Sequence, residues 1–201
     1  MDENFIRARR FGSPQMGEIR FITDVCIEKF EAFANSGSLG STDDYPTEVV
    51  ALYKAMKFQP PGDRFRSLTA CMRGCCGSAL RGHGLGSGIV LVADCDRIRE
   101  QTWIFNGDVQ NLARELARNA LDSACVTYTH AGSEISRIVE WLNALRPRSS
   151  SISSPKLRLY GGSFEARLFR SLEPADVAYV HIPAQDKRAM AAARKLESRL
   201  S

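Results

Sequence analysis

Arginine is the residue type with which this chain can do most chemistry. The sequence has 201 residues and 27 cationic side chains, of which 21 are Arg and six are Lys. A guanidinium keeps its charge when half buried, and its planar fork binds a phosphate through two hydrogen bonds. The bias therefore favours a surface that contacts nucleic acid or packs through ion pairs. GC-rich coding would produce the same bias, so composition alone leaves both explanations open.

Cationic residues are concentrated in two stretches. Residues 58–92 hold four Arg against one Asp, a net charge of +3, and residues 146–170 hold five Arg and one Lys against one Glu, a net charge of +5. Between them, Arg97 and Arg99 stand two residues apart, a spacing that lets both forks lie along a polyanion. Neighbouring carboxylates would keep such binding weak and salt-sensitive. These clusters predict either contact with nucleic acid or a solvated charged surface.

A second group of side chains has the chemistry of metal ligands: Cys71, Cys75, Cys76 and His83. Zinc accepts these ligand types, but their spacing matches no common zinc motif and a second ligand pair is missing. We therefore favour cysteines buried as small hydrophobes over a zinc site or a reactive thiol, and we predict no metal and no cofactor. The glycine-rich residues 82–88 precede an apolar run, whereas a phosphate-binding loop follows a strand, so we expect a connector there.

No catalytic signature is visible in the sequence. The chain has three histidines and no Gly-x-Ser-x-Gly elbow, and we predict that it is not an enzyme. The longest uncharged apolar run, Ile89–Ala93, is too short to span a bilayer, and the N-terminus shows no secretory signal. We therefore expect no membrane partner, and six cysteines that stay reduced inside a cell.

The elements expected to position these residues are mostly helices. Apolar residues at a helical period predict helices over residues 18–34, from Pro46 to the break at residues 59–63, over residues 109–124 and over residues 133–145. A short helix is expected over residues 163–171 and a last helix after Pro183, while residues 89–92 predict a short strand or one turn of a buried helix.

The fold class expected from these elements is mainly α. It has a four-helix-bundle-like core, short strands or extended segments, and a C-terminal helix. The expected domain organisation is an N-terminal arm over residues 1–17, a helical bundle core over residues 18–172, and a C-terminal extension with a helix over residues 173–201.

The order of short motifs along the chain is distinctive. Two predicted helices lead to a break with Arg64-Phe65, and an apolar segment then ends in Asp96-Arg97-Ile98-Arg99. A long predicted helix and a tail with Ser163-Phe164-Glu165 follow. Over roughly residues 18–172, this order resembles the coat proteins of rod-shaped plant RNA viruses, the tobamovirus-like and furovirus-like group.

The resemblance implies a self-assembling structural capsid protein that packages single-stranded RNA in a helical rod. It implies a four-helix bundle, a helical homo-oligomer as partner, and a location in the virion and the host cytoplasm. Arg97 and Arg99 would pair with RNA phosphates, with Arg81 and Arg64 as weaker candidates. Two alternatives remain open: a small intracellular helical enzyme or effector with a site near Cys75 and His83, and an oligomeric nucleic-acid-binding regulator.

Overall fold

The structure is a computed structural model, and it describes residues 5–10, 19–40, 45–72, 88–145, 163–183 and 185–200. Within these ranges, eight strands form one sheet. In chain order they are β1 (Phe5–Arg10), β2 (Ile19–Val25), β3 (Arg66–Met72), β4 (Ile89–Ala93), β5 (Thr102–Phe105), β6 (Tyr128–His130), β7 (Ser163–Leu168) and β8 (Val177–Pro183). From one edge to the other they lie in the order β1-β8-β4-β2-β3-β7-β5-β6, and each neighbouring pair is antiparallel.

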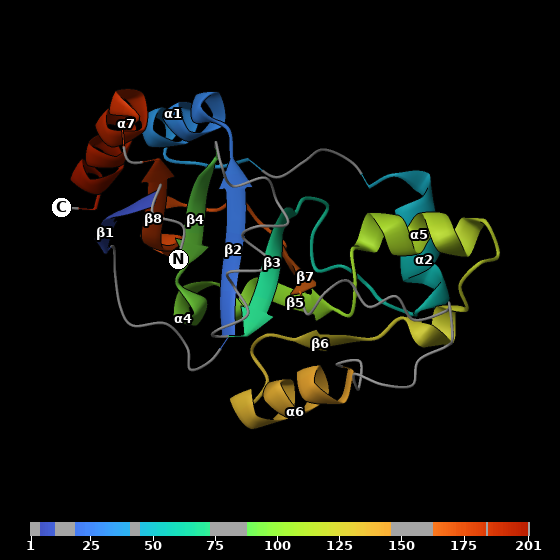
Figure 1. Ribbon diagram of the computed structural model, residues 1–201. Coiled ribbons are helices and arrows are strands. Elements are labelled where there is room, and N and C mark those ends of the chain that lie inside the picture. Colours follow the sequence, from blue (N-terminus) through green and yellow to red (C-terminus); the bar gives the residue numbers. More distant parts are fainter. Residues whose placement is uncertain are drawn as a thin grey trace.

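Helices lie at both ends of this sheet. They are α1 (Ile27–Ser36), α2 (Thr47–Ala55), α4 (Cys95–Ile98), α5 (Val109–Ala117), α6 (Ile135–Leu145) and α7 (Lys187–Ser198), with short 3-10 turns η1 (Arg99–Gln101), η2 (Ser123–Cys125) and η3 (Pro174–Asp176). Figure 1 shows α1 and α7 side by side at one end of the sheet, and α2 and α5 side by side at the other. No helix in the described ranges is long and apolar enough to cross a membrane.

The predicted mainly α fold with a four-helix-bundle-like core is therefore wrong. The molecule is a mixed α/β protein whose centre is an antiparallel sheet. The four-helix bundle that the resemblance implies is not the architecture of the described chain, and the resemblance itself stays a prediction. Strands from the predicted arm (β1) and the predicted extension (β8) pair directly with each other, and the three-part division of the chain stays a prediction.

One predicted helix begins as a strand, and the short helix predicted over residues 163–171 is wrong because that segment forms a strand, for an identifiable reason. Residues 18–34 split into β2 and α1, and residues 163–171 contain β7. In β2, Ile22 is buried on the face opposite to Phe21, so it interrupts the alternation of the apolar residues along this strand. In β7, the apolar residues do alternate, but the run is only six residues long. Short strands buried on both faces cannot be told from helices by periodicity.

The other expected elements are closer to the structure. Helices over Thr47–Ala55, Ile135–Leu145 and Lys187–Ser198 are confirmed, and of the two alternatives left open for residues 89–92 the structure has the strand, at Ile89–Ala93. The helix expected over residues 109–124 starts at Val109, where the side chain of Asp108 accepts a hydrogen bond from the Asn111 backbone N–H at 2.8 Å. It ends at Ala117, and Asn119 two residues later has a left-handed φ of 55°.

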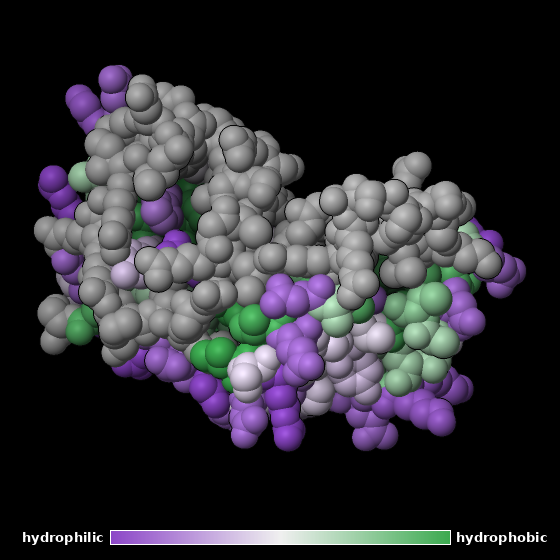
Figure 2. Space-filling view, turned by 60° about the horizontal axis from the view of Figure 1, so that its bottom comes forward, coloured by the Kyte–Doolittle hydropathy of each residue, from purple (hydrophilic) through white to green (hydrophobic). Residues whose placement is uncertain are grey.

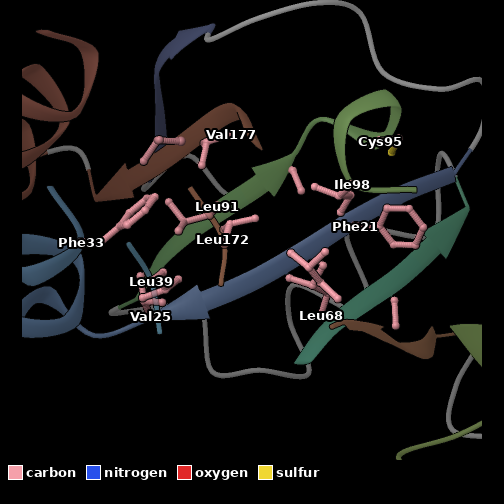
Figure 3. Close-up of a cluster of buried hydrophobic side chains, with 14 of the residues drawn as sticks. Phe21, Val25, Phe33, Leu39, Leu68, Leu91, Cys95, Ile98, Leu172 and Val177 are labelled. Atoms are coloured by element: carbon pink, nitrogen blue, oxygen red, sulfur yellow. The ribbon is translucent and has the colours of Figure 1, made fainter. Parts of the chain in front are cut away.

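The sheet separates two hydrophobic cores. The first includes side chains of β2, β3, β4, β7 and β8 with α1, α4, α6 and α7, and Figure 3 shows part of it around Phe21, Leu91 and Phe33. The second joins α2 and α5 to the opposite face of β5 and β6. Ile104 lies in the first core and its neighbour Phe105 in the second. Because successive side chains of a strand point to opposite faces, β5 takes part in both cores.

Candidate functional site

The two arginines expected to bind phosphate have different surroundings, and their role in RNA binding stays a prediction. Arg97 lies on α4 with 55% of its side chain exposed, and its Nε is 3.9 Å from Oδ2 of the buried Asp94. Arg99 lies on η1, where its Nε is 3.3 Å from Glu100 Oε1 and its Nη2 donates to the Gly132 carbonyl at 3.2 Å. Arg99 therefore holds two segments of the protein together, and Arg97 alone of the pair is largely exposed.

The remaining predicted residues are scattered or undescribed. Arg64 is exposed in the connection between α2 and β3, away from α4. Arg81, Cys75, Cys76 and His83 lie outside the described residues, as does the side chain of Cys71. In the part of the chain that the structure describes, no group of three or more His, Cys, Asp or Glu side chains could hold a metal ion.

A groove between α1 and α7 offers a better candidate site. It has a volume of about 440 Å³, and the residues that line it are Glu31, Ala34, Asn35, Lys187, Arg188, Ala191, Ala192 and Lys195. Three of the lining residues are alanines, whose short side chains let a ligand approach the helix backbones. Its polar lining consists of three cations, one carboxylate and one amide, which makes the groove basic.

The helical repeat explains why these cations share one side of α7. Arg188, Ala191, Ala192 and Lys195 are spaced by three, four and seven residues, which places them on one face of a helix. The neighbouring face carries Ala189, Ala193 and Leu196 into the first core. Sequence reading found this helix and its surrounding charges but not the groove, because the partner helix α1 lies about 150 residues earlier in the chain.

Polar contacts hold α1 against α7 along the groove. Arg199 donates from Nε to the Ala34 carbonyl at 2.9 Å and from Nη2 to the Asn35 carbonyl, so it caps the last turn of α1. Lys195 Nζ donates to Asn35 Oδ1 at 2.5 Å. A cation at a helix C-terminus also complements the partial negative charge there. The two walls of the groove are therefore fixed relative to each other.

The one carboxylate of the groove lining, Glu31, is paired with Arg188. Nε of Arg188 donates to Oε1 at 3.0 Å and Nη2 donates to Oε2 at 2.7 Å. These hydrogen bonds hold the pKa of the Glu31 carboxyl below its ordinary value and raise the pKa of the Arg188 guanidinium. The pair is neutral as a whole, so the remaining positive charge of the groove lining comes from Lys187 and Lys195, while the charges of Glu28 and Asp186 also act on Arg188.

Apolar surface is a weaker candidate for a binding site. Figure 2 brings the lower side of the molecule in Figure 1 forward and shows green apolar patches bordered by purple charged residues. On α6, the side chains of Ile135, Val139, Trp141 and Leu145 are only partly buried. They pack against the first core, so we interpret them as the outer edge of that core.

A buried polar network beneath α2 and α5 was missed by sequence reading. Arg167 on β7 is 1% exposed, donates from Nε to Glu165 Oε1 at 2.7 Å and donates from Nη1 to the Tyr53 hydroxyl at 2.7 Å. Glu165 also accepts hydrogen bonds from the Ser67 hydroxyl and from the Val109 backbone N–H at the start of α5. With its polar atoms engaged inside the protein, this network joins elements and does not face a ligand.

Comparison with known proteins does not identify a functional site. Comparison of the chain with protein-family models, with curated proteins and with solved structures finds no significant match. The candidate site therefore rests on the geometry and charge of the groove between α1 and α7.

Proposed function

We propose that this protein binds single-stranded RNA through the phosphate backbone, along the groove between α1 and α7, and that it acts by binding and not by catalysis. The observation that carries the proposal is a groove of about 440 Å³ lined by three cations and a single carboxylate that is already paired. Arg and Lys side chains beside a polyanion displace its counterions, which favours binding without any base-specific contact.

The spacing of the two lysines favours an extended anion over a compact one. Lys187 and Lys195 are eight residues apart on α7, which corresponds to about 12 Å along the helix axis. A single phosphate between them would require both side chains to lie flat along the helix. In a chain of phosphates, different phosphates can contact the two lysines. Single-stranded RNA is such a chain, and the arginine-rich composition is consistent with it.

The chemistry of the groove supports binding more than turnover. Its described lining holds alanine, asparagine, lysine, arginine and the paired Glu31. General acid–base catalysis needs a titratable group within hydrogen-bonding reach of a substrate, and nucleophilic catalysis needs an activated nucleophile. The cations of this lining supply positive charge and hydrogen-bond donors, which serve binding.

The test is the binding of a fluorescein-labelled 20-nucleotide oligouridylate, followed by fluorescence anisotropy from 0.05 to 0.5 M salt. Lys187→Gln/Lys195→Gln should lower the salt slope of the association constant by about 1.4, because each phosphate contact of a single strand contributes about 0.7. If the plots of log association constant against log salt concentration for the wild type and the variant meet at 1 M salt, the variant binds about 25-fold more weakly at 0.1 M.

The matched control removes two positive charges at the other end of the sheet. Lys54→Gln/Arg118→Gln changes exposed residues of α2 and of the end of α5, and it should bind the oligonucleotide like the wild-type protein. Inorganic phosphate at the same ionic strength should compete no better than chloride. Equal affinity of the groove variant and the wild type, or equal losses in both variants, would overturn the proposal.

A further inference from the structure

Glu31 holds Arg188 in the way that a phosphate would hold it. The two carboxylate oxygens receive two hydrogen bonds from the guanidinium, of 3.0 Å and 2.7 Å. Arginine binds carboxylates and phosphates through the same bidentate fork. In the free protein, the one arginine of the groove lining is therefore occupied by an internal anion.

This pair is exposed enough to exchange its partner. The side chain of Arg188 is 59% exposed and that of Glu31 is 35% exposed. Ion pairs in contact with water contribute little to stability, because water and dissolved ions compete for both partners. The buried pair of Arg167 and Glu165 is the opposite case in the same molecule. An incoming phosphate can therefore displace Glu31 without opening the fold.

We infer that Glu31 is an internal competitor for the groove, which limits its affinity for RNA and selects ligands that engage several cations at once. The inference rests on the proposed function. A small anion that contacts Arg188 alone exchanges one bidentate contact for another and gains little. A ligand that also contacts Lys187 and Lys195 gains contacts that Glu31 does not supply. Because of Glu31, a ligand must contact the groove through several phosphates in order to bind.

Glu31→Gln should make the groove bind RNA more tightly. In the oligouridylate titration, we expect about two- to fivefold higher affinity at 0.1 M salt, the range that corresponds to an exposed ion pair. The salt slope should become steeper by about 0.7, because one more cation is free to meet a phosphate. Glu140→Gln on the exposed surface of α6 removes the same charge elsewhere, and it should leave both quantities unchanged.

A double-mutant cycle isolates the contribution of Arg188. In an Arg188→Gln background, Glu31→Gln should no longer steepen the salt slope by the roughly 0.7 of a new phosphate contact, since no fork remains to be released and only repulsion by an unpaired carboxylate is relieved. Glu31→Ala should reproduce the gain of Glu31→Gln, and circular dichroism and thermal unfolding check that each variant is folded. A steepening of the salt slope that persists without Arg188, or no gain in affinity from Glu31→Gln in the wild-type background, would overturn the inference. If Lys187→Gln/Lys195→Gln weakens RNA binding but Glu31→Gln leaves RNA affinity unchanged, the proposed function stands. Only the inference that Glu31 competes with RNA is then wrong.

Discussion

Arg167 is a fully buried charged side chain with 1% of its surface exposed. Its guanidinium contacts a carboxylate, a phenol and an aromatic ring, with Cζ 4.0 Å from the centroid of Phe65. Phe65 in turn stacks on Tyr45 with ring centroids 5.2 Å apart. A buried charge is tolerated only while its partners remain, so this network is more sensitive to losing one member than to losing two.

Arg167→Met should destabilise the protein by about 3–5 kcal/mol, because it leaves the Glu165 carboxylate without its buried cation. Urea unfolding followed by circular dichroism measures the change. Arg167→Met/Glu165→Gln should recover part of the loss, since the stranded charge is then absent. Arg137→Met, which breaks an exposed pair with Glu134 on the α6 side, should change stability by about 1 kcal/mol or less. A similar loss in both arginine variants would contradict this account.

Tyr45 should make the protein sensitive to alkaline pH. Burial raises the pKa of Tyr45 to about 12, against the opposing effect of the Arg167 charge, and burial also raises the pKa of Tyr53. An unfolded tyrosine ionises near pH 10. Between about pH 10 and pH 12, the folded chain keeps a proton that the unfolded chain releases, so stability is full below pH 10 and falls as the pH rises through this window.

The variant Tyr45→Phe tests this linkage. At pH 7 it should be less stable by about 1 kcal/mol, because the hydrogen bond from the Tyr45 hydroxyl to the Gly62 carbonyl at 2.7 Å is lost. Its stability should then fall less steeply than that of the wild type from pH 10 to pH 12. Urea midpoints measured at each pH give both slopes, and parallel slopes would refute the role of Tyr45.

The sequence pointed to arginine as the informative residue type but not to which arginines matter. Arg97 and Arg99 were selected for their spacing, yet the structure binds Arg99 to Glu100 and to the Gly132 carbonyl. Arg167 counted only as one cation in a basic stretch. The alternation of Phe164, Ala166 and Leu168 was the available signal, because it places Arg167 on the opposite face of a strand. Charge alone does not distinguish a buried guanidinium from a solvated one.

The segment from β2 to α1 shows why the helices were easier to predict than the strands. Residues 18–34 fit a single helical stripe, but β2 pairs with β3 on one side and with β4 on the other. Those partners come from residues 66–72 and 89–93, so no local pattern reveals them. Helices such as α6 and α7 satisfy their backbone hydrogen bonds within one segment, and their period was readable for that reason.

Gly37 should be needed to end α1. It has a left-handed φ of 76°, and its backbone N–H donates to the Phe33 carbonyl at 2.8 Å. A Cβ at this position would lie 2.8 Å from Nη1 of Arg199, the residue that caps α1. Gly37→Ala should therefore cost about 1–2 kcal/mol in urea unfolding, the penalty for a side chain in left-handed backbone.

Gly40→Ala is the matched control for Gly37. A Cβ at Gly40 would have no neighbour within 4 Å, so the substitution meets open space. Its stability should equal or slightly exceed that of the wild type, because alanine reduces the freedom of the unfolded chain. Equal effects of the two substitutions would show that the end of α1 does not depend on the left-handed glycine.

The two cores lie on opposite faces of one sheet, and this arrangement joins the ends of the molecule. Strand β7 places Ala166 and Leu168 in the first core and Arg167 beneath the helices of the second. The same strand pairs with β3 on one side and with β5 on the other. A loss of packing in one core therefore disturbs strands on which the other core is built, and we expect the molecule to unfold as one unit.

The two tryptophans of the chain allow that expectation to be tested, since Trp103 packs at the edge of the second core and Trp141 at the edge of the first. Variants with a single tryptophan, Trp141→Phe and Trp103→Phe, should show for each probe the same urea midpoint by fluorescence as by circular dichroism. Adding Phe58→Ala, which removes a ring of the second core, should lower the free energy of unfolding by about 3–5 kcal/mol. The urea midpoints of both tryptophan probes should fall together. Val50→Ala at an exposed position of α2 should leave them in place. A shift confined to Trp103 would mean that the two cores unfold independently and that the shared sheet does not couple them.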